Sequence, residues 1–521
     1  MGVPPVSATT NDFRAAPRQA VTAPSAGRSR GAVTAERLIP FGAALGALAV
    51  QLMRPTNPDV SWLLTVNERI LAGATPYKDV IELNPPASIL LYRIPVLVAK
   101  LLSARPELVV AGMLALLVGG ALAYAGGLAA RYRLSASADN GVFLGVAALV
   151  LAVLPFDEMA QREHFATIFM FPFALVAIGR AAGERIALAD ALIAGALLGL
   201  CVAIKPHFAL CALLVASFAA WRRRDVRAFL RAEYWAAGAV ALAYFIASAI
   251  FYPKFFSDVL PMLADLYLPL RLDAVELAKR IALPLALPVA VCWICRDRTR
   301  NAGTWVLLLI GAGFAGAYLM QGKGWSYHAY PAIAFCLIAA GWATQQAESE
   351  ATGLTRLLGA LLLATALILP APRFFRSDVS NPALAAAISR LAPHPRILAI
   401  AFPLRVGHPL TRDIGGVWVG RTWGLWATGG AVFMKARAGD DPAKRAKADA
   451  YFEGDRLTVA QDIETQRPDI VLIQETVGFD FAQWIAQSPP LQGAMNRYKR
   501  VETIDDIEIY QRRDEAAAGR S

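Results

Sequence analysis

Acidic side chains gather in a polar stretch between two apolar segments of the chain. The stretch runs from residue 59 to residue 86 and reads DVSWLLTVNERILAGATPYKDVIELNPP. Its carboxylates are Asp59, Glu68, Asp79 and Glu82. Carboxylates beside a lipid bilayer are costly unless they face water or take part in function. We therefore expect a polar loop with a chemical role. Its first part, residues 60–71, is expected to form a short amphipathic helix that lies on the membrane surface.

Three further polar clusters lie between apolar runs. They read DEMAQREH at residues 157–164, KPH at residues 205–207 and QGKGWSYH at residues 321–328. Three of the five histidines of the chain fall in these clusters. Carboxylates, cations and imidazoles are thus concentrated in a few short segments, and the question is whether the fold brings these segments to one side.

The composition is that of a polytopic membrane protein. The chain has 521 residues, of which 56% are hydrophobic and 17% charged, and its mean hydropathy is +0.45. Soluble domains carry about 25% charged residues. The net charge is +11, but the basic residues lie in short clusters between apolar runs, as membrane topology requires. This distribution excludes a nucleic-acid-binding protein.

The order of the apolar runs predicts the topology. Residues 1–34 are basic and poor in bulky apolar side chains, which predicts a disordered cytoplasmic arm. The run at 38–53 lacks a cleavage signal, so we expect a retained first crossing. Residues 86–103 contain Pro95 and are ambiguous. If this segment stays on the external side, the strongest arginine clusters fall on the cytoplasmic side. If it crosses the membrane, those clusters would lie outside.

The sequence therefore predicts about eleven transmembrane helices in a domain of residues 35–372, with a first external loop at 54–107. The crossings are expected near 38–53, 108–130, 141–155, 165–179, 188–204, 207–221, 233–252, 280–295, 303–320, 329–345 and 355–371. All four polar clusters then lie on the external side. The inside loops hold arginines but no histidine, so this asymmetry indicates an external active site.

The composition becomes that of a soluble protein near residue 373. Residues 381–391 suit a helix, and 396–402, 470–473 and 507–510 suit short buried strands. We expect a small α/β domain over residues 373–521, on the external side because eleven crossings start from the inside. It contains no glycine-rich phosphate loop.

The first polar stretch resembles the first external loop of the GT-C glycosyltransferases. The likeness rests on Asp59 soon after the first crossing, on Glu68, on the pattern Gly73-x-x-Pro76-Tyr77-x-Asp79 and on Pro85-Pro86. GT-C enzymes, such as the protein O-mannosyltransferases and the lipid A aminoarabinose transferase, take a sugar from a polyprenyl-phosphate carrier. Many members have two adjacent acids at the first position, whereas Val60 follows Asp59 here.

The resemblance implies a role for each cluster. Asp59 would be the general base that accepts the proton of the acceptor hydroxyl. The acids that would orient the acceptor or lie near a metal are Asp79, Glu82, Asp157 and Glu158. The cations that would bind the donor phosphate are Arg162, His164, Lys205, His207, Lys323 and His328. The structural alternatives are a helix cap for Asp59, turn formation for the acids, and snorkelling or local ion pairs for the cations.

The sequence thus predicts an inner-membrane glycosyltransferase of bacterial type that transfers a sugar from a polyprenyl-phosphate donor to an external glycan, lipid or protein acceptor. Whether a divalent metal takes part stays open, and no other cofactor is indicated. One alternative is a transporter or flippase for a lipid-linked sugar, although no paired halves are visible in the sequence. Another is a non-catalytic assembly protein that binds through its C-terminal domain.

Overall fold

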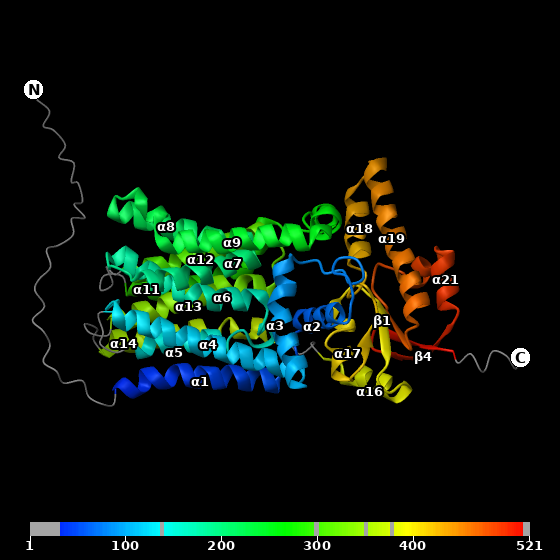
Figure 1. Cartoon of the computed structure of the whole chain (residues 1–521), viewed down its shortest axis with the longest axis horizontal. Helices are drawn as coiled ribbons and strands as arrows, with labels where there is room; N and C mark the ends of the chain where they lie inside the picture. Colours follow the sequence, from blue (N-terminus) through cyan, green and yellow to red (C-terminus); the bar gives the residue numbers. More distant parts are fainter. Residues whose placement is uncertain (1–31, 136–139, 296–301, 348–352, 376–379, 514–521) are drawn as a thin grey trace, which may run out of the picture.

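The structure is a computed structural model, and it describes residues 32–513 except 136–139, 296–301, 348–352 and 376–379. Figure 1 shows a bundle of long helices with a smaller sheet-containing part at one end. Most of the predicted N-terminal arm, residues 1–31, lies outside the described residues.

Each predicted crossing coincides with a helix of the bundle. These helices are α1 (Ala32–Met53), α4 (Pro106–Arg131), α5 (Gly141–Ala152), α6 (Arg162–Ala182), α7 (Leu188–Ile204), α8 (Ala209–Arg223), α9 (Ala232–Phe251), α11 (Ala274–Ile294), α12 (Ala302–Gln321), α13 (Ser326–Ala347) and α14 (Gly353–Ile368). In the described chain, six helices are long and apolar enough to cross a membrane, or seven if the bent pair α1 and α2 counts as one span. Four predicted crossings, at α5, α7, α8 and α13, are not among these helices, although α5 and α7 are shorter apolar helices, and these four crossings stay predictions.

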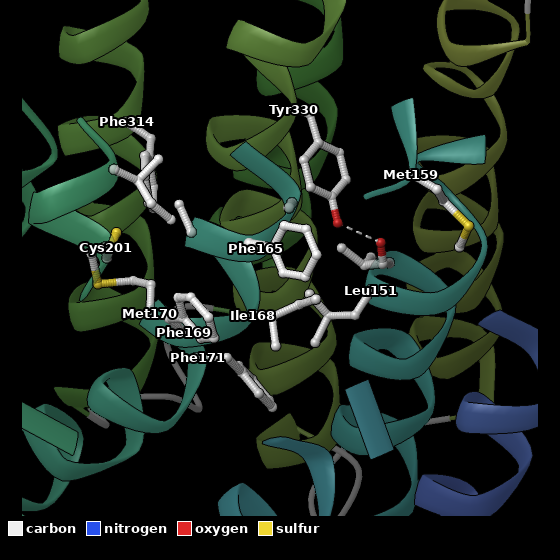
Figure 2. Packing of buried hydrophobic residues seen from close by; sticks show 14 of the residues in the cluster. Leu151, Met159, Phe165, Ile168, Phe169, Met170, Phe171, Cys201, Phe314 and Tyr330 are labelled. Carbon is white, nitrogen blue, oxygen red and sulfur yellow. Dashed lines mark hydrogen bonds between the residues drawn. The ribbon is translucent and has the colours of Figure 1, made fainter. Parts of the chain in front are cut away.

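Helix α6 lies at the centre of the bundle. It packs against α4, α7, α12 and α13, and 89% of its most apolar window is buried. Figure 2 shows its side chains Phe165, Phe169 and Phe171 packed among the neighbouring helices. The hydroxyl of buried Tyr330 donates to the carbonyl of Val150 at 2.9 Å. A side chain at the start of α6 therefore projects from a rigid support.

The segment predicted as the first external loop contains two helices, α2 (Pro58–Leu71) and α3 (Pro86–Leu102). The chain bends by 84° between α1 and α2, so α2 leaves the direction of the first crossing. Figure 1 shows α3 lying crosswise at the end of the bundle, and α3 is not among the helices that could span a membrane in the described chain. This agrees with the prediction that residues 86–103 stay on one side.

The expected surface position of α2 is wrong. Residues 60–67 are buried without interruption, whereas an interfacial helix would leave one face in water. The reason is that the C-terminal part covers α2 from the other side. Such cover comes from residues more than 300 positions away and leaves no periodic signal in the helix itself.

The C-terminal part is an α/β domain with a five-stranded sheet in the order β2-β1-β3-β5-β4. The strands are β1 (Arg396–Ile400), β2 (Val417–Trp418), β3 (Ile470–Gln474), β4 (Tyr498–Ile504) and β5 (Ile507–Arg512). The main helices are α16 (Pro382–Leu391), α17 (Leu410–Asp413), α18 (Trp426–Arg437), α19 (Pro442–Gln466), α20 (Phe481–Ala486) and α21 (Pro489–Met495). β2, β1 and β3 run parallel to one another. β5 is antiparallel to β3, and β4 is antiparallel to β5. The three predicted strands and the helix at 381–391 are confirmed.

Arg412 joins this domain to the first external loop. Its guanidinium donates to both carboxylate oxygens of Glu68 on α2, and its Nε donates to Glu107 on α4 at 2.7 Å. The ring of His408 packs against Trp62 of α2, with 5.4 Å between the ring centroids. Arginine–carboxylate pairs with two hydrogen bonds fix orientation as well as distance, so the domain holds α2 in place.

Candidate functional site

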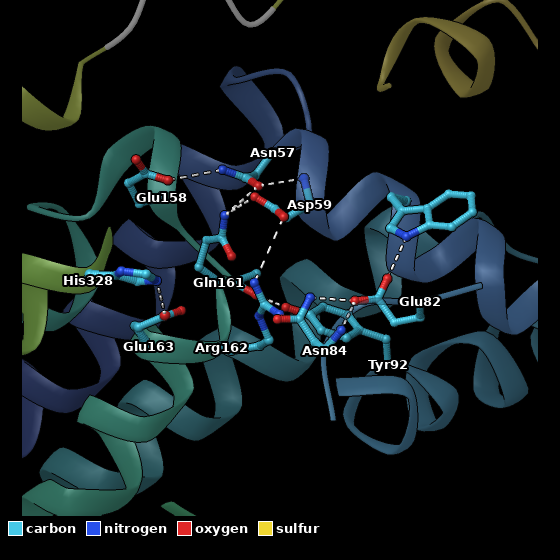
Figure 3. A network of polar contacts seen from close by, with 12 residues as sticks. Asn57, Asp59, Glu82, Asn84, Tyr92, Glu158, Gln161, Arg162, Glu163 and His328 are labelled. Carbon is cyan, nitrogen blue, oxygen red and sulfur yellow. Dashed lines mark hydrogen bonds and ion pairs between the residues drawn. The ribbon is translucent and has the colours of Figure 1, made fainter. Parts of the chain in front are cut away.

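Arg162 lies at the centre of a buried polar cluster (Figure 3). It is the first residue of α6, and its side chain is only 4% exposed. Its nearest ion-pair partner is Asp59, with 3.9 Å between Nη2 and Oδ1. Among the described residues, its Nε and Nη1 have no hydrogen-bond partner. A buried guanidinium with two unsatisfied nitrogens is costly, so this arrangement indicates a site for an anionic ligand.

Asp59 occupies the first turn of α2, where the fold presents its carboxylate to Arg162. Asn57 caps the helix by accepting a hydrogen bond from the Asp59 amide at 2.9 Å. The amide nitrogen of Gln161 donates to Asp59 Oδ2, also at 2.9 Å. The Asp59 side chain is 29% exposed, in contrast to Arg162. One oxygen is therefore oriented, while the group as a whole can still be reached.

The cations of two other turns meet on Glu163, the residue after Arg162. Lys205 Nζ donates to Glu163 Oε1 and to Gln321 Oε1, each at 2.5 Å. It also lies 3.0 Å from His328 Nε2, which is 3.4 Å from the same Glu163 oxygen. Three segments that are far apart in sequence thus converge beside Arg162.

Asp157 and Glu158 lie in this cluster and contact other side chains of the protein. Arg54 pairs with Asp157, with its Nε 2.9 Å from Oδ1. Asn57 donates to Glu158 at 3.2 Å, and Ser326 donates to the other Glu158 oxygen at 2.5 Å. These contacts join the end of α1 to the starts of α2, α6 and α13. They support a positioning role and place no acceptor beside either carboxylate.

The two other predicted acceptor ligands shape the loop. Glu82 is buried and accepts hydrogen bonds from Trp62 Nε1 at 2.5 Å and from the Asn84 amide at 2.8 Å. Burial raises the pKa of Glu82, against the opposing effects of Arg162 and of these hydrogen bonds. Asp79 closes the turn at Thr75, whose amide hydrogen bond lowers the pKa of Asp79. The turn-forming alternative describes both residues.

Two predicted phosphate ligands are engaged elsewhere. Both ring nitrogens of His164 contact main chain, at Ala160 and at Leu151. Lys323 donates to the carbonyls of Tyr267 and Leu270, and burial lowers its pKa to about 8.

His207 lies near Lys205, and burial, followed by the charge of Lys205, lowers the pKa of its imidazole to about 4. A neutral imidazole adds no positive charge at neutral pH. Of the six predicted phosphate ligands, the structure brings Arg162, Lys205 and His328 together. Burial, followed by the charge of Lys205, also lowers the pKa of His328, so Arg162 and Lys205 carry the positive charge of the cluster.

Amide side chains that the sequence analysis assigned no role complete the cluster. Gln161 orients Asp59, and Gln321 holds Lys205. Glu163 was considered only as a partner of Arg162, whereas its hydrogen bond goes to Lys205. The available signal was their position inside the polar clusters at 157–164 and 321–328, but polar residues of this kind are common at helix ends.

The residues do not fit a resident metal ion. In the described part of the chain, no group of three or more histidine, cysteine or acidic side chains is arranged to hold one. The oxygens of Glu82 accept from Trp62 and Asn84, as described above. The divalent metal that the sequence analysis left open is therefore given no role in the chemistry below.

No protein-family model matches the chain, and no curated protein matches it in sequence. Among solved structures, it is similar to ArnT from Cupriavidus metallidurans, whose crystal structure is described as bound to undecaprenyl phosphate. The TM-score is 0.54 at 13% sequence identity, and the match covers 92% of this chain and 98% of ArnT. The likeness extends over both the helical bundle and the C-terminal part. At this identity it shows the fold alone, which is that of ArnT, and the helical bundle with a small C-terminal sheet agrees with the architecture predicted from the sequence.

Proposed function

We propose that the chain is an integral membrane glycosyltransferase that takes a sugar from a polyprenyl-phosphate carrier. The acceptor would be a glycan, lipid or protein on the external side of a bacterial-type inner membrane. Two findings support the proposal. The fold is that of ArnT, which was crystallised with undecaprenyl phosphate, and a buried cationic cluster lies beside a reachable carboxylate.

The observation that carries the proposal is the incomplete pairing of Arg162. Its Nε and Nη1 lack partners among the described residues, and its ion pair with Asp59 is long, at 3.9 Å. A phosphate oxygen would satisfy these nitrogens with charge-assisted hydrogen bonds, which are the strong ones in proteins. A donor phosphate at the end of α6 would also lie at the favourable end of the helix dipole.

The geometry then gives each group a step in the reaction. The acceptor hydroxyl approaches Asp59, whose carboxylate accepts the proton as the oxygen attacks the anomeric carbon. The bond from that carbon to the phosphate breaks, and the negative charge grows on the departing phosphate. Arg162 stabilises this charge inside a site of low dielectric, where a preorganised cation acts strongly.

Lys205 and His328 support the same end of the reaction. Glu163 and Gln321 hold Lys205 beside Arg162, so its ammonium contributes positive potential without having to move. Glu163 limits the net charge of the empty cluster. This balance allows several cations to stay close together before the donor arrives.

Purified protein in lipid nanodiscs provides the test. Undecaprenyl phosphate should bind the wild type and bind Arg162→Gln at least tenfold more weakly, while Arg223→Gln, at the exposed last residue of α8, should bind like the wild type. Equal binding by all three proteins would contradict the proposed phosphate site. A protein that bound the lipid but never consumed any polyprenyl-phosphate sugar would contradict the transferase and favour a transporter or assembly role.

Sidedness has its own test, because all five native cysteines are buried. Asp440→Cys places a thiol on the C-terminal domain, and Val226→Cys places one on an exposed turn between α8 and α9. An impermeant maleimide added to intact spheroplasts should label the first and miss the second. The reverse pattern would place the Asp59 site in the cytoplasm.

A further inference from the structure

The C-terminal domain contains a cavity that the chemistry above does not use. Its volume is about 580 Å³, within the range of roughly 300–1,000 Å³ that is usual for small-molecule sites. The walls are the start of α16, the turn at Leu404–Val406, α17, the end of β3 and the β4–β5 turn. Several segments far apart in sequence thus surround one space.

The sheet topology places this cavity where α/β domains bind ligands. From β1 the chain goes to β2 on one side, and it later returns to β3 on the other side of β1. The strand order therefore reverses between β1 and β3. Gln474 ends β3, and Arg405 and Val406 follow β1, so these cavity residues lie at the carboxyl ends of the two strands. Ligands of open α/β sheets bind in the crevice at this switch point.

The polar lining is acidic and rich in amides. Among the described lining residues, Asp413, Asp505 and Asp506 contribute carboxylates and Arg405 contributes a cation. Gln474 is only 7% exposed. Its Nε2 donates to Asp506 at 2.8 Å, and its Oε1 has no hydrogen-bond partner among the described residues. A hydroxyl-rich ligand supplies many donors for such acceptors, whereas a phosphate group would meet excess negative charge.

The cavity lies near the Asp59 cluster. Phe375 stacks on Phe156, with 3.9 Å between the ring centroids, and Phe156 directly precedes Asp157 of the cluster. Ser380, five residues further along, already lines the cavity. Five residues of extended chain span at most about 18 Å. Arg412 also ties α17, the opposite wall, to Glu68 on α2.

We propose that this cavity binds the glycan part of the acceptor, a hydroxyl-rich ligand without phosphate. The assignment as acceptor rests on the proposed transferase function, but binding of the glycan does not. The acidic lining separates the site from the phosphate-binding cluster at Arg162. Donor and acceptor would thus be selected by opposite charge at two neighbouring places.

The test uses full-length protein in nanodiscs without any sugar donor. Three probes of equal length are compared: N-acetylchitotetraose, its deacetylated amine form and a phosphorylated tetrasaccharide. We expect the neutral or amine-bearing probe to bind at least tenfold more tightly than the phosphorylated one. Ala385→Trp fills the cavity and should weaken that binding at least tenfold, whereas Ala386→Trp, on the exposed face of the same helix, should leave it unchanged.

A second pair of variants guards against misfolding of the tryptophan mutant. Asp413→Asn changes an exposed cavity residue and should weaken binding up to about tenfold, as one lost hydrogen bond does, while Asp440→Asn should not. The proposal is overturned if no probe binds, if the phosphorylated probe binds best, or if each variant matches its control. If glycan binding holds while the wild-type protein never consumes a polyprenyl-phosphate sugar, the transferase assignment fails and the cavity stands as a glycan site.

Discussion

The two ends of α6 each carry a buried or nearly buried arginine, and their partners differ. At the C-terminal end, Arg180 Nε and Nη2 donate to the two carboxylate oxygens of Glu233 at 3.0 and 3.1 Å. At the N-terminal end, Arg162 has its closest carboxylate oxygen at 3.9 Å, and two of its nitrogens lack partners among the described residues. The hydrogen bonds of Arg180 are thus satisfied within the protein, whereas Arg162 keeps nitrogens available for a ligand.

The difference separates an arginine that stabilises the fold from one that serves a site. A closed pair with two parallel hydrogen bonds holds α6 against α9 and leaves nothing to bind. An incompletely paired cation in a buried place weakens the fold, and proteins keep such groups mainly where they act on a ligand. Substitutions at each end of α6 test this difference between the two arginines.

Asp59→Asn should have the largest effect on turnover. The change keeps the side-chain shape but removes the general base, which typically costs about 100- to 10,000-fold in rate. Thermal unfolding in detergent should be unchanged, because Asp59 is partly exposed and accepts only one side-chain hydrogen bond. Turnover within about twofold of the wild type in a purified enzyme would exclude Asp59 as the base.

Arg180→Gln should have the largest effect on stability. It leaves the Glu233 carboxylate buried without its partner, and breaking a buried pair costs about 3–5 kcal/mol. The thermal midpoint should fall markedly, while turnover per folded molecule and the affinity for undecaprenyl phosphate stay the same. The double variant Arg180→Gln with Glu233→Gln should recover part of the loss. A selective loss of donor affinity would break the proposed contrast between the two ends.

Arg162→Gln should show the opposite pattern. Donor affinity should fall by about ten- to a hundredfold, since a charged contact to phosphate contributes roughly 1.5–3 kcal/mol. The midpoint of thermal unfolding should stay within about two degrees, because no close ion pair is lost. A large drop in stability with unchanged donor affinity would show that Arg162, like Arg180, serves the fold.

Gln161→Ala should have the smallest effect. It removes the hydrogen bond that orients Asp59 Oδ2, so kcat should fall up to about tenfold with little change in the KM for the donor. Gln161→Glu places a second carboxylate beside Asp59 and should shift the acidic limb of the pH–rate profile upward. If the alanine variant instead raises the donor KM and leaves kcat alone, Gln161 contacts the donor.

The sequence predicted what depends on local pattern. The apolar runs predicted the bundle helices, and the arginine distribution favoured residues 86–103 as a segment that does not cross, which agrees with the structure. Asp59 was predicted as the base from the resemblance, and this role stays a prediction. The charge of a residue, however, does not reveal its partner. Lys205 and Lys323 look alike in sequence, but one meets Glu163 and the other meets two carbonyl groups.

Contacts that the pattern of residue types does not reveal account for the errors. Glu82 accepts hydrogen bonds from Trp62, 20 residues earlier, and from Asn84, two residues later, and His164 contacts Ala160 and Leu151, four and 13 residues earlier. The edge strand β4 escaped prediction because its sequence, YKRVETI, alternates exposed charges with few apolar residues. Whether a turn or a strand edge forms such contacts depends on the packing around it.

The clamp formed by Arg412 with Glu68 and Glu107 restricts how this architecture can change in evolution. The start of α2 is anchored to the membrane bundle through Asn57 and Gln161, and its other end is anchored to the C-terminal domain through Glu68. Both the helical bundle and the C-terminal domain therefore position the helix that carries Asp59. A fusion protein with the C-terminal half of a relative would misplace Asp59 unless the residues on both sides of the clamp, Arg412 and Glu68, were exchanged together. Natural variation in acceptor choice should therefore arise by substitution around the cavity more readily than by shuffling whole domains.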